Sequence, residues 1–244
     1  MRAGWQLRMS ICAGATLFLC GCPNPNTYTA PRTLDPGGFQ FSVAPELYGF
    51  SVKTSTATID PVTNAPTTQS STASFFTPTL PTVGVRYGVV NNFEIGARLP
   101  NLDSVAFDGK VQFVRGGVDL AIDPGAQAFF VGTSDGSAGV FYLHLPLMVG
   151  VNLSEKVTLV LAPGIVYTVA TATVVTSNSA QQGATATGVM ARLSAGVDIR
   201  VTKRIALHPE LTFMKGFDSS EALLYVFGFG LNFGAQPNYS DVGH

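Results

Sequence analysis

The stretch TGVMARLSAGVDIRV, residues 187 to 201, shows the pattern that decides the fold of this chain. Apolar residues occupy every second position, and no charged residue falls among them. The apolar set consists of Val189, Ala191, Leu193, Ala195, Val197, Ile199 and Val201. The intervening set consists of Gly188, Met190, Arg192, Ser194, Gly196, Asp198 and Arg200. Because successive side chains of a β-strand point to opposite faces, this period predicts a strand with one apolar and one polar face.

The same period recurs in segment after segment from Phe39 onward, whereas a helical period is hard to find. Short polar links alternate with long links rich in Ser, Thr and Gly. The short links lie at 90 to 92, 115 to 117, 154 to 156 and 202 to 204, and the long ones near 54 to 74, 100 to 106, 132 to 139 and 170 to 186, with a smaller one at 218 to 221. Between them we predict about ten strands, near 39 to 53, 75 to 89, 93 to 99, 107 to 114, 117 to 131, 140 to 152, 157 to 169, 187 to 201, 205 to 217 and 222 to 234.

An even set of strands with short links at one rim and long links at the other resembles the bacterial outer-membrane β-barrels. The resemblance covers residues 39 to 234. It implies an all-β fold, an up-and-down antiparallel transmembrane β-barrel with short periplasmic turns and long outer loops. Gly228, Leu231 and Phe233 have the spacing of the C-terminal insertion signal of that class, while Phe227 and the polar tail that follows depart from it.

The composition of the polar face indicates which side of each strand points outward. Only 12% of the residues are charged, against about 25% in an average soluble domain. The polar face is made of Gly, Ala, Ser, Thr, Gln and Asn with a few charges of both signs, which suits a crowded lumen. We therefore expect the apolar face to meet lipid. The alternative is a soluble lipocalin-like cup whose apolar face lines a ligand pocket.

The N-terminus has the layout of a secretory signal. Arg2 and Arg8 precede an apolar run that ends at Leu19, and this run is too short to span a bilayer comfortably. The sequence Leu-Cys-Gly-Cys at 19 to 22 resembles the lipobox of bacterial lipoproteins, with Cys20 at an unusual position. The resemblance implies a signal peptide over 1 to 21, lipid attachment at Cys22 and, because Pro23 follows, sorting to the outer membrane.

Three further segments are predicted. Residues 22 to 38, rich in Pro, Asn and Thr, are expected to form an extended tether that holds the folded body away from its lipid. Residues 39 to 234 form the barrel, and residues 235 to 244 a polar tail. All three cysteines lie at or before residue 22, so no internal disulfide is expected in the exported body.

The sequence offers little for catalysis or cofactor binding. His144 and His208 have no second His or Cys at metal-ligand spacing, and His244 lies in the tail. Gly-x-Gly at 228 to 230 does not precede a helix, so it predicts no nucleotide loop. A net charge of −1 gives no electrostatic case for nucleic acid. We expect no metal, no cofactor and no enzymatic activity.

A charged cluster in the lumen is the remaining site prediction. The short link after residue 114 sets Gln112 opposite Asp119 and Asp108 opposite Asp123, with Lys110 diagonal to both Asp119 and Asp123. Asp119 and Asp123 could act as a carboxylate pair in acid–base chemistry. Neutralisation of the acidic group by Lys110 is the simpler interpretation, so we predict a lumen cluster of Lys110, Asp108, Asp119 and Asp123.

The predicted function is that of a lipid-anchored outer-membrane barrel with a structural role, a narrow pore or a binding role for its loops. The alternative is a lipid-anchored soluble carrier of an apolar ligand. Expected partners are membrane lipid and the machineries for barrel assembly and lipoprotein sorting, and the expected location is the outer membrane of a bacterial cell envelope.

Overall fold

The computed structural model of this chain describes residues 24–59, 66–102, 104–133, 136–175, 181–217 and 222–242. The predicted signal peptide, Cys22 and His244 lie outside the described residues. Among the residues that are described, no helix is long and apolar enough to cross a membrane.

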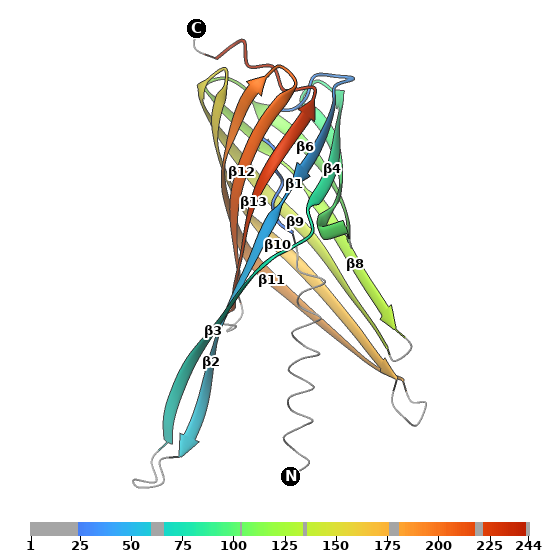
Figure 1. Cartoon of the computed structure of the whole chain (residues 1–244), viewed down its shortest axis with the longest axis vertical. Coiled ribbons are helices and arrows are strands. Elements are labelled where there is room, and N and C mark those ends of the chain that lie inside the picture. The colour runs from blue at the N-terminus through green and yellow to red at the C-terminus, as the bar shows by residue number, and fades with distance from the viewer. Residues whose placement is uncertain are drawn as a thin grey trace.

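The described residues form one closed antiparallel barrel of ten strands, as predicted (Figure 1). The segments are β1 Phe39–Ala44, β2 Glu46–Ile59, β3 Pro66–Pro78, β4 Thr82–Val90, β5 Phe93–Leu99, β6 Ser104–Val114, β7 Val118–Ile122, β8 Gly125–Thr133, β9 Gly136–Ser154, β10 Val157–Val175, β11 Gln181–Thr202, β12 Ile205–Gly216 and β13 Ala222–Gly234, with a short 3-10 turn η1 at Pro100–Leu102. Three strands are interrupted, so that β1 continues as β2, β3 as β4 and β7 as β8. Pairing of β1 with β13, from Gln40↔Gly234 to Val43↔Leu231, closes the barrel.

The two rims differ as the alternation of link lengths predicts. Short turns join β4 to β5, β6 to β7, β9 to β10 and β11 to β12 at the upper rim in Figure 1, where β1 begins and β13 ends. At the opposite rim the strands β2, β3, β9, β10 and β11 extend well past the barrel.

The segments predicted as long links contain more strand than the sequence analysis expects. Within the predicted links, β2 and β3 stay paired out to Ile59↔Pro66, and β10 and β11 out to Val175↔Gln181. Residues 183 to 187 are all exposed, so both faces of this extension meet solvent. A strand with two polar faces lacks the apolar alternation on which the prediction depends, although Thr favours extended structure.

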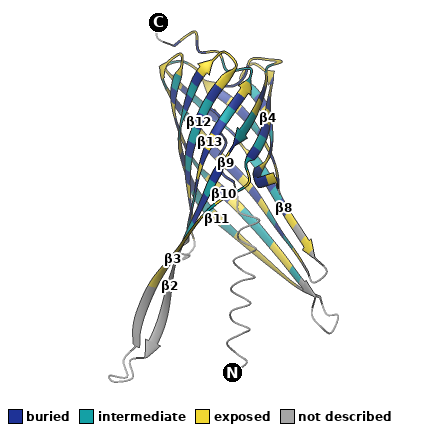
Figure 2. Ribbon diagram, in the orientation of Figure 1, coloured by how far each residue is buried: buried dark blue, intermediate teal, exposed yellow. Residues whose placement is uncertain are grey.

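Buried and exposed positions alternate along the wall strands (Figure 2), and the exposed set is largely apolar, as predicted. On β11, Leu193 is 45% exposed, whereas Ser194 and Asp198 are 2% and 4% exposed. Large apolar side chains cover the outside of every strand of the barrel wall. Because closure pairs the first strand with the last, the wall buries its backbone donors and acceptors in its own ladders.

The segment before β1 does not follow the sequence analysis. Residues 24 to 34 are extended, as expected, but every one of them is buried inside the barrel. The expected role of this segment as an external tether is therefore wrong for these residues. Their polar side chains and free backbone amides serve as partners for the polar groups of the lumen, which a Pro/Asn/Thr-rich composition does not reveal.

Candidate functional site

The candidate site is the lumen together with residues 24 to 34, which we call the plug. The plug runs lengthwise through the barrel. At one end Asn24 donates through its side chain to Thr82 Oγ1 at 2.8 Å, and its backbone amide donates to Gln127 Oε1 at 3.1 Å. At the other end the chain leaves the lumen at the rim of short turns, where Gly37 N–H donates to the Gly88 carbonyl at 2.8 Å.

Side chains of the wall bind the backbone of the plug. Thr27 and Tyr28 donate their backbone N–H groups to Glu210 Oε2 at 3.0 and 2.7 Å. Leu34 N–H donates to Glu94 Oε2 at 2.7 Å. Charge-assisted hydrogen bonds of this kind are stronger than neutral ones, so two wall carboxylates fix the plug at separate depths.

Tyr28 packs the plug against β13. Its hydroxyl accepts a hydrogen bond from Asn26 at 2.9 Å and donates to Glu46. The ring lies over Gly228 and Gly230, where an added Cβ would stand 1.9 and 2.8 Å from Tyr28 atoms. These glycines therefore leave the space in which Tyr28 lies, a reason that the sequence analysis missed.

A balanced charge cluster fills the lumen beside the plug. It contains three basic and three acidic side chains, all at most 7% exposed: Arg86, Arg98, Lys110, Glu94, Asp108 and Asp123. Arg86 lies 2.6 Å from Glu94 and 3.1 Å from Asp123, and it also pairs with Asp108. Lys110 Nζ lies 2.8 Å from Glu94 Oε1 and donates to the Ala30 carbonyl of the plug at 2.6 Å.

The structure brings together three of the four residues predicted for this cluster. Lys110, Asp108 and Asp123 belong to it, whereas Asp119 pairs elsewhere. The predicted register is wrong, because Gln112 pairs with Ala121 and Asp108 with Gly125. The observed register at Gln112 differs from the predicted one by two residues, and the ladder is irregular between Gln112 and Val114, which nothing in the sequence marks.

The direct partner of Lys110 is Glu94, which the sequence analysis missed. Glu94 lies on the polar face of the segment 93 to 99, four residues before Arg98. Its position on the polar face indicates that it lies in the lumen. To predict it as the partner of Lys110 would require knowing which strand neighbours the 107 to 114 segment and in which register.

Asp119 pairs with the plug itself. Arg32 donates to both carboxylate oxygens of Asp119, each at 2.9 Å, and both side chains are fully buried. Asn152 donates to the same carboxylate at 2.8 Å. This bidentate pair joins a charge of the plug to a charge of the wall.

The C-terminal tail closes the lumen at the rim of short turns. Residues 238 to 241 make the contacts. Tyr239 lies between two guanidinium groups, with Arg32 4.2 Å and Arg200 3.5 Å from the ring centroid. Burial raises the pKa of the Tyr239 phenol well above its ordinary value, so the ring stays neutral between the two cations. Arg32 also donates to the Asn238 carbonyl at 2.7 Å and pairs with Asp241.

Both strand histidines are buried in the lumen. His208 Nδ1 is 3.4 Å from Asp198, and His144 is 7% exposed. In the part of the chain that the structure describes, no three His, Cys, Asp or Glu side chains gather as metal ligands would.

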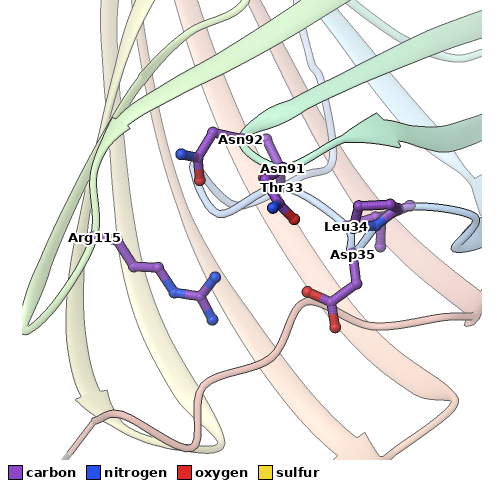
Figure 3. Close-up of a pocket in the computed structure, with 7 residues that line it drawn as sticks. Thr33, Leu34, Asp35, Asn91, Asn92 and Arg115 are labelled. Carbon is purple, nitrogen blue, oxygen red and sulfur yellow. The ribbon is translucent and has the colours of Figure 1, made fainter.

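Two cavities border the plug. A cavity of about 10 Å³, close to the smallest that holds a single water, lies among Ala30, Glu94 and Asp198. A larger cavity of about 330 Å³ opens at the rim of short turns, where Thr33, Asp35, Asn92 and Arg115 surround it (Figure 3). Turn and plug residues supply its lining, which is mainly polar.

A closed barrel with an apolar outer surface and a polar, filled lumen has the architecture of a transmembrane β-barrel.

No family model matches this chain, and no curated protein matches it. Among solved structures, the chain is similar to the attachment invasion locus protein Ail of Yersinia pestis, at 12% identity, with 82% of this chain and 99% of that one covered and a TM-score of 0.36. It is also similar to the outer-membrane protease OmpT of Escherichia coli (8%, 83% and 98%, TM-score 0.47) and to the translocator domain of the autotransporter NalP of Neisseria meningitidis (11%, 95% and 96%, TM-score 0.43). The fold assignment rests on strand pairing in this chain.

The charge balance of the cluster predicts the effect of Lys110→Met. The variant leaves two basic groups against three acidic ones, so we expect a loss of about 3 to 5 kcal/mol in the free energy of unfolding in detergent at neutral pH. Adding Glu94→Gln restores the balance and should recover much of the loss. Adding Asp119→Asn should recover none, because Asp119 pairs with Arg32. Equal rescue by both additions would contradict the observed pairing.

The close approach of Tyr28 to β13 predicts that Gly228→Val expels the plug. Trypsin should then cleave after Arg32 in the folded barrel, whereas the parent should resist because Arg32 is fully buried. The matched control is Gly183→Val, since a Cβ at Gly183 would meet only one atom, at 3.9 Å. Resistance in the Gly228 variant equal to that of the control would contradict the placement of Tyr28.

Proposed function

We propose that this protein is a lipid-anchored outer-membrane barrel that its own N-terminal segment keeps closed, and that it supports long outer hairpins used for binding. The burial of residues 24 to 34 in the lumen is the observation that carries this proposal. A barrel with such a plug is a rigid support and not a permanently open pore.

The outer surface supports the membrane part of the proposal. On the strand β9 the outward residues Leu143, Leu145, Leu147 and Val151 are 41 to 46% exposed, and the alternate residues between them are buried. In water such a surface would be a large exposed apolar patch, which monomeric soluble proteins avoid. In a bilayer it faces hydrocarbon.

The lumen argues against the soluble carrier. A lipocalin-like cup would hold its apolar ligand against inward-facing apolar residues. Here the described wall presents Arg86, Arg98, Arg192, Asp198 and Glu210 to the interior, all nearly buried. An apolar ligand there would have to displace the plug, and Arg98 and Glu210 would lose the plug groups that bond to them.

The extended hairpins are the elements best placed to bind. The pairs β2–β3 and β10–β11 project past the barrel at the rim opposite the short turns (Figure 1). Extensions on a rigid scaffold commonly carry recognition. In the outer-membrane orientation, in which short turns face the periplasm, these hairpins reach the cell exterior.

The lipid anchor and the location follow from the sequence resemblance. Cys22, at the lipobox, is the proposed attachment site, with the membrane as lipid partner and the assembly and sorting machineries as transient partners. We propose no enzymatic activity for this barrel.

The membrane proposal predicts a position-dependent cost for a new charge. Leu147→Arg places a cation on the outer face of β9 and should cost about 2 to 4 kcal/mol in unfolding experiments in lipid vesicles. Thr185→Arg, on the exposed extension of β11, should cost about 0 to 0.5 kcal/mol. Equal costs at both positions would indicate a barrel in water.

The plug predicts the conductance of the barrel in planar bilayers. The parent should pass little current, while deletion of residues 24 to 36 should open a path. The described wall has seven buried acidic and five buried basic side chains, a balance of −2, so this path should prefer cations. The acidic set is Glu46, Glu94, Asp108, Asp119, Asp123, Asp198 and Glu210, and the basic set is Arg86, Arg98, Lys110, Arg192 and Arg200.

Heat-modifiable gel migration would show that the deletion variant is folded, and Thr185→Arg is the control with its plug intact. A parent that conducts as well as the folded deletion variant would refute closure by the plug.

A further inference from the structure

The direction of the plug bears on where a lipid anchor at Cys22 can lie. The chain leaves the lumen at the rim of short turns, where Gly37 bonds to Gly88 and Gly38 accepts from the same residue. Eleven residues earlier in the plug, Asn26 donates to Tyr28, and the first described residue, Asn24, donates to Glu46 and Thr82. The plug thus runs from the hairpin side toward the short turns.

The depth of Asn24 can be bounded from the wall. Its partner Glu46 follows Phe39, the first residue of β1, by seven positions. At about 3.3 Å per residue and a strand tilt of about 35 to 45°, Glu46 lies about 16 to 19 Å from the rim of short turns. The apolar band of such barrels is about 25 Å tall, so Asn24 lies past the midplane toward the hairpins.

The wall near Asn24 is interrupted on the hairpin side. The strand β5 ends at Leu99, and the 3-10 turn η1 replaces a strand before β6 begins at Ser104. Among the described residues, β3 pairs with β2 alone and stands at the end of the strand order. Asn24 bonds to residues on both flanks of this interruption, Thr82 on β4 and Gln127 on β8.

Apolar side chains surround the outer side of the same interruption. Leu80, Leu102 and Val105 are 60%, 52% and 44% exposed. An acyl chain that reached this part of the wall would therefore meet apolar surface.

We infer that the acyl chains on Cys22 lie on the hairpin side of the membrane, in the outer leaflet, and that the plug enters the barrel from there. Cys22 precedes Asn24 by two residues, which span at most about 7 Å of extended chain. Acyl chains must reach hydrocarbon. The periplasmic leaflet is at the rim of short turns, which is the other end of the plug from Asn24. A seated plug and an anchor in the periplasmic leaflet exclude one another. This inference rests on the proposed membrane location and lipidation.

The test inserts a recognition site for a sequence-specific protease, flanked by Gly-Ser spacers, between Pro23 and Asn24 of the full-length protein. Cells are labelled with radioactive palmitate, and the protease is added outside. We expect intact cells to show loss of the palmitate label from the barrel and a downward shift of the barrel on a denaturing gel.

Cleavage only after the outer membrane has been permeabilised would overturn the inference. Resistance in both intact and permeabilised cells would overturn it as well, because the site would then reach neither compartment. If palmitate is never incorporated, the lipid anchor of the proposed function fails, while the gel shift still reports the side of the N-terminus.

A matched insertion after Ser154, in the exposed turn between β9 and β10, tests the orientation separately. This variant should be cut only in permeabilised cells. Cleavage of the Ser154 variant in intact cells would show that the barrel orientation in the proposed function is inverted.

Discussion

The pairing of charges inside a closed lumen is the constraint on which the rest of this structure depends. A buried charge without a partner costs several kcal/mol, and the wall alone does not provide all the partners. Asp119 pairs with Arg32, and Glu210 accepts hydrogen bonds from two backbone amides. All of these partners belong to the plug. The wall and the plug are therefore parts of one polar network, in which Asp119 and Glu210 have these partners only with the plug in place.

The barrel itself could be predicted from the sequence because each strand of the wall separates two environments. Lipid outside and a polar lumen inside impose the alternation seen at Leu193 and Ser194, and the link lengths give the rims. The extensions beyond the barrel, such as residues 183 to 187, meet water on both faces. They lose the alternation, and their strands could not be predicted.

The plug and its contacts with the wall could not be predicted for a different reason. Arg32 and Asp119 are 87 residues apart in sequence, and a composition rich in Pro, Asn and Thr is equally typical of a solvated linker. For the cluster, the polar face correctly placed Lys110, Asp108 and Asp123 in the lumen. Which residue binds Lys110 depends on strand register and on a local irregularity. Periodicity in the sequence does not encode either.

The central claim is that residues 24 to 34 lie inside the folded barrel, and hydrogen exchange of the purified protein in detergent tests it most directly. The amides of Thr27, Tyr28 and Leu34, which donate to buried carboxylates, should exchange as slowly as those of the barrel strands. Exchange of these amides at the rate of an unstructured peptide, while the strands stay protected, would contradict the account.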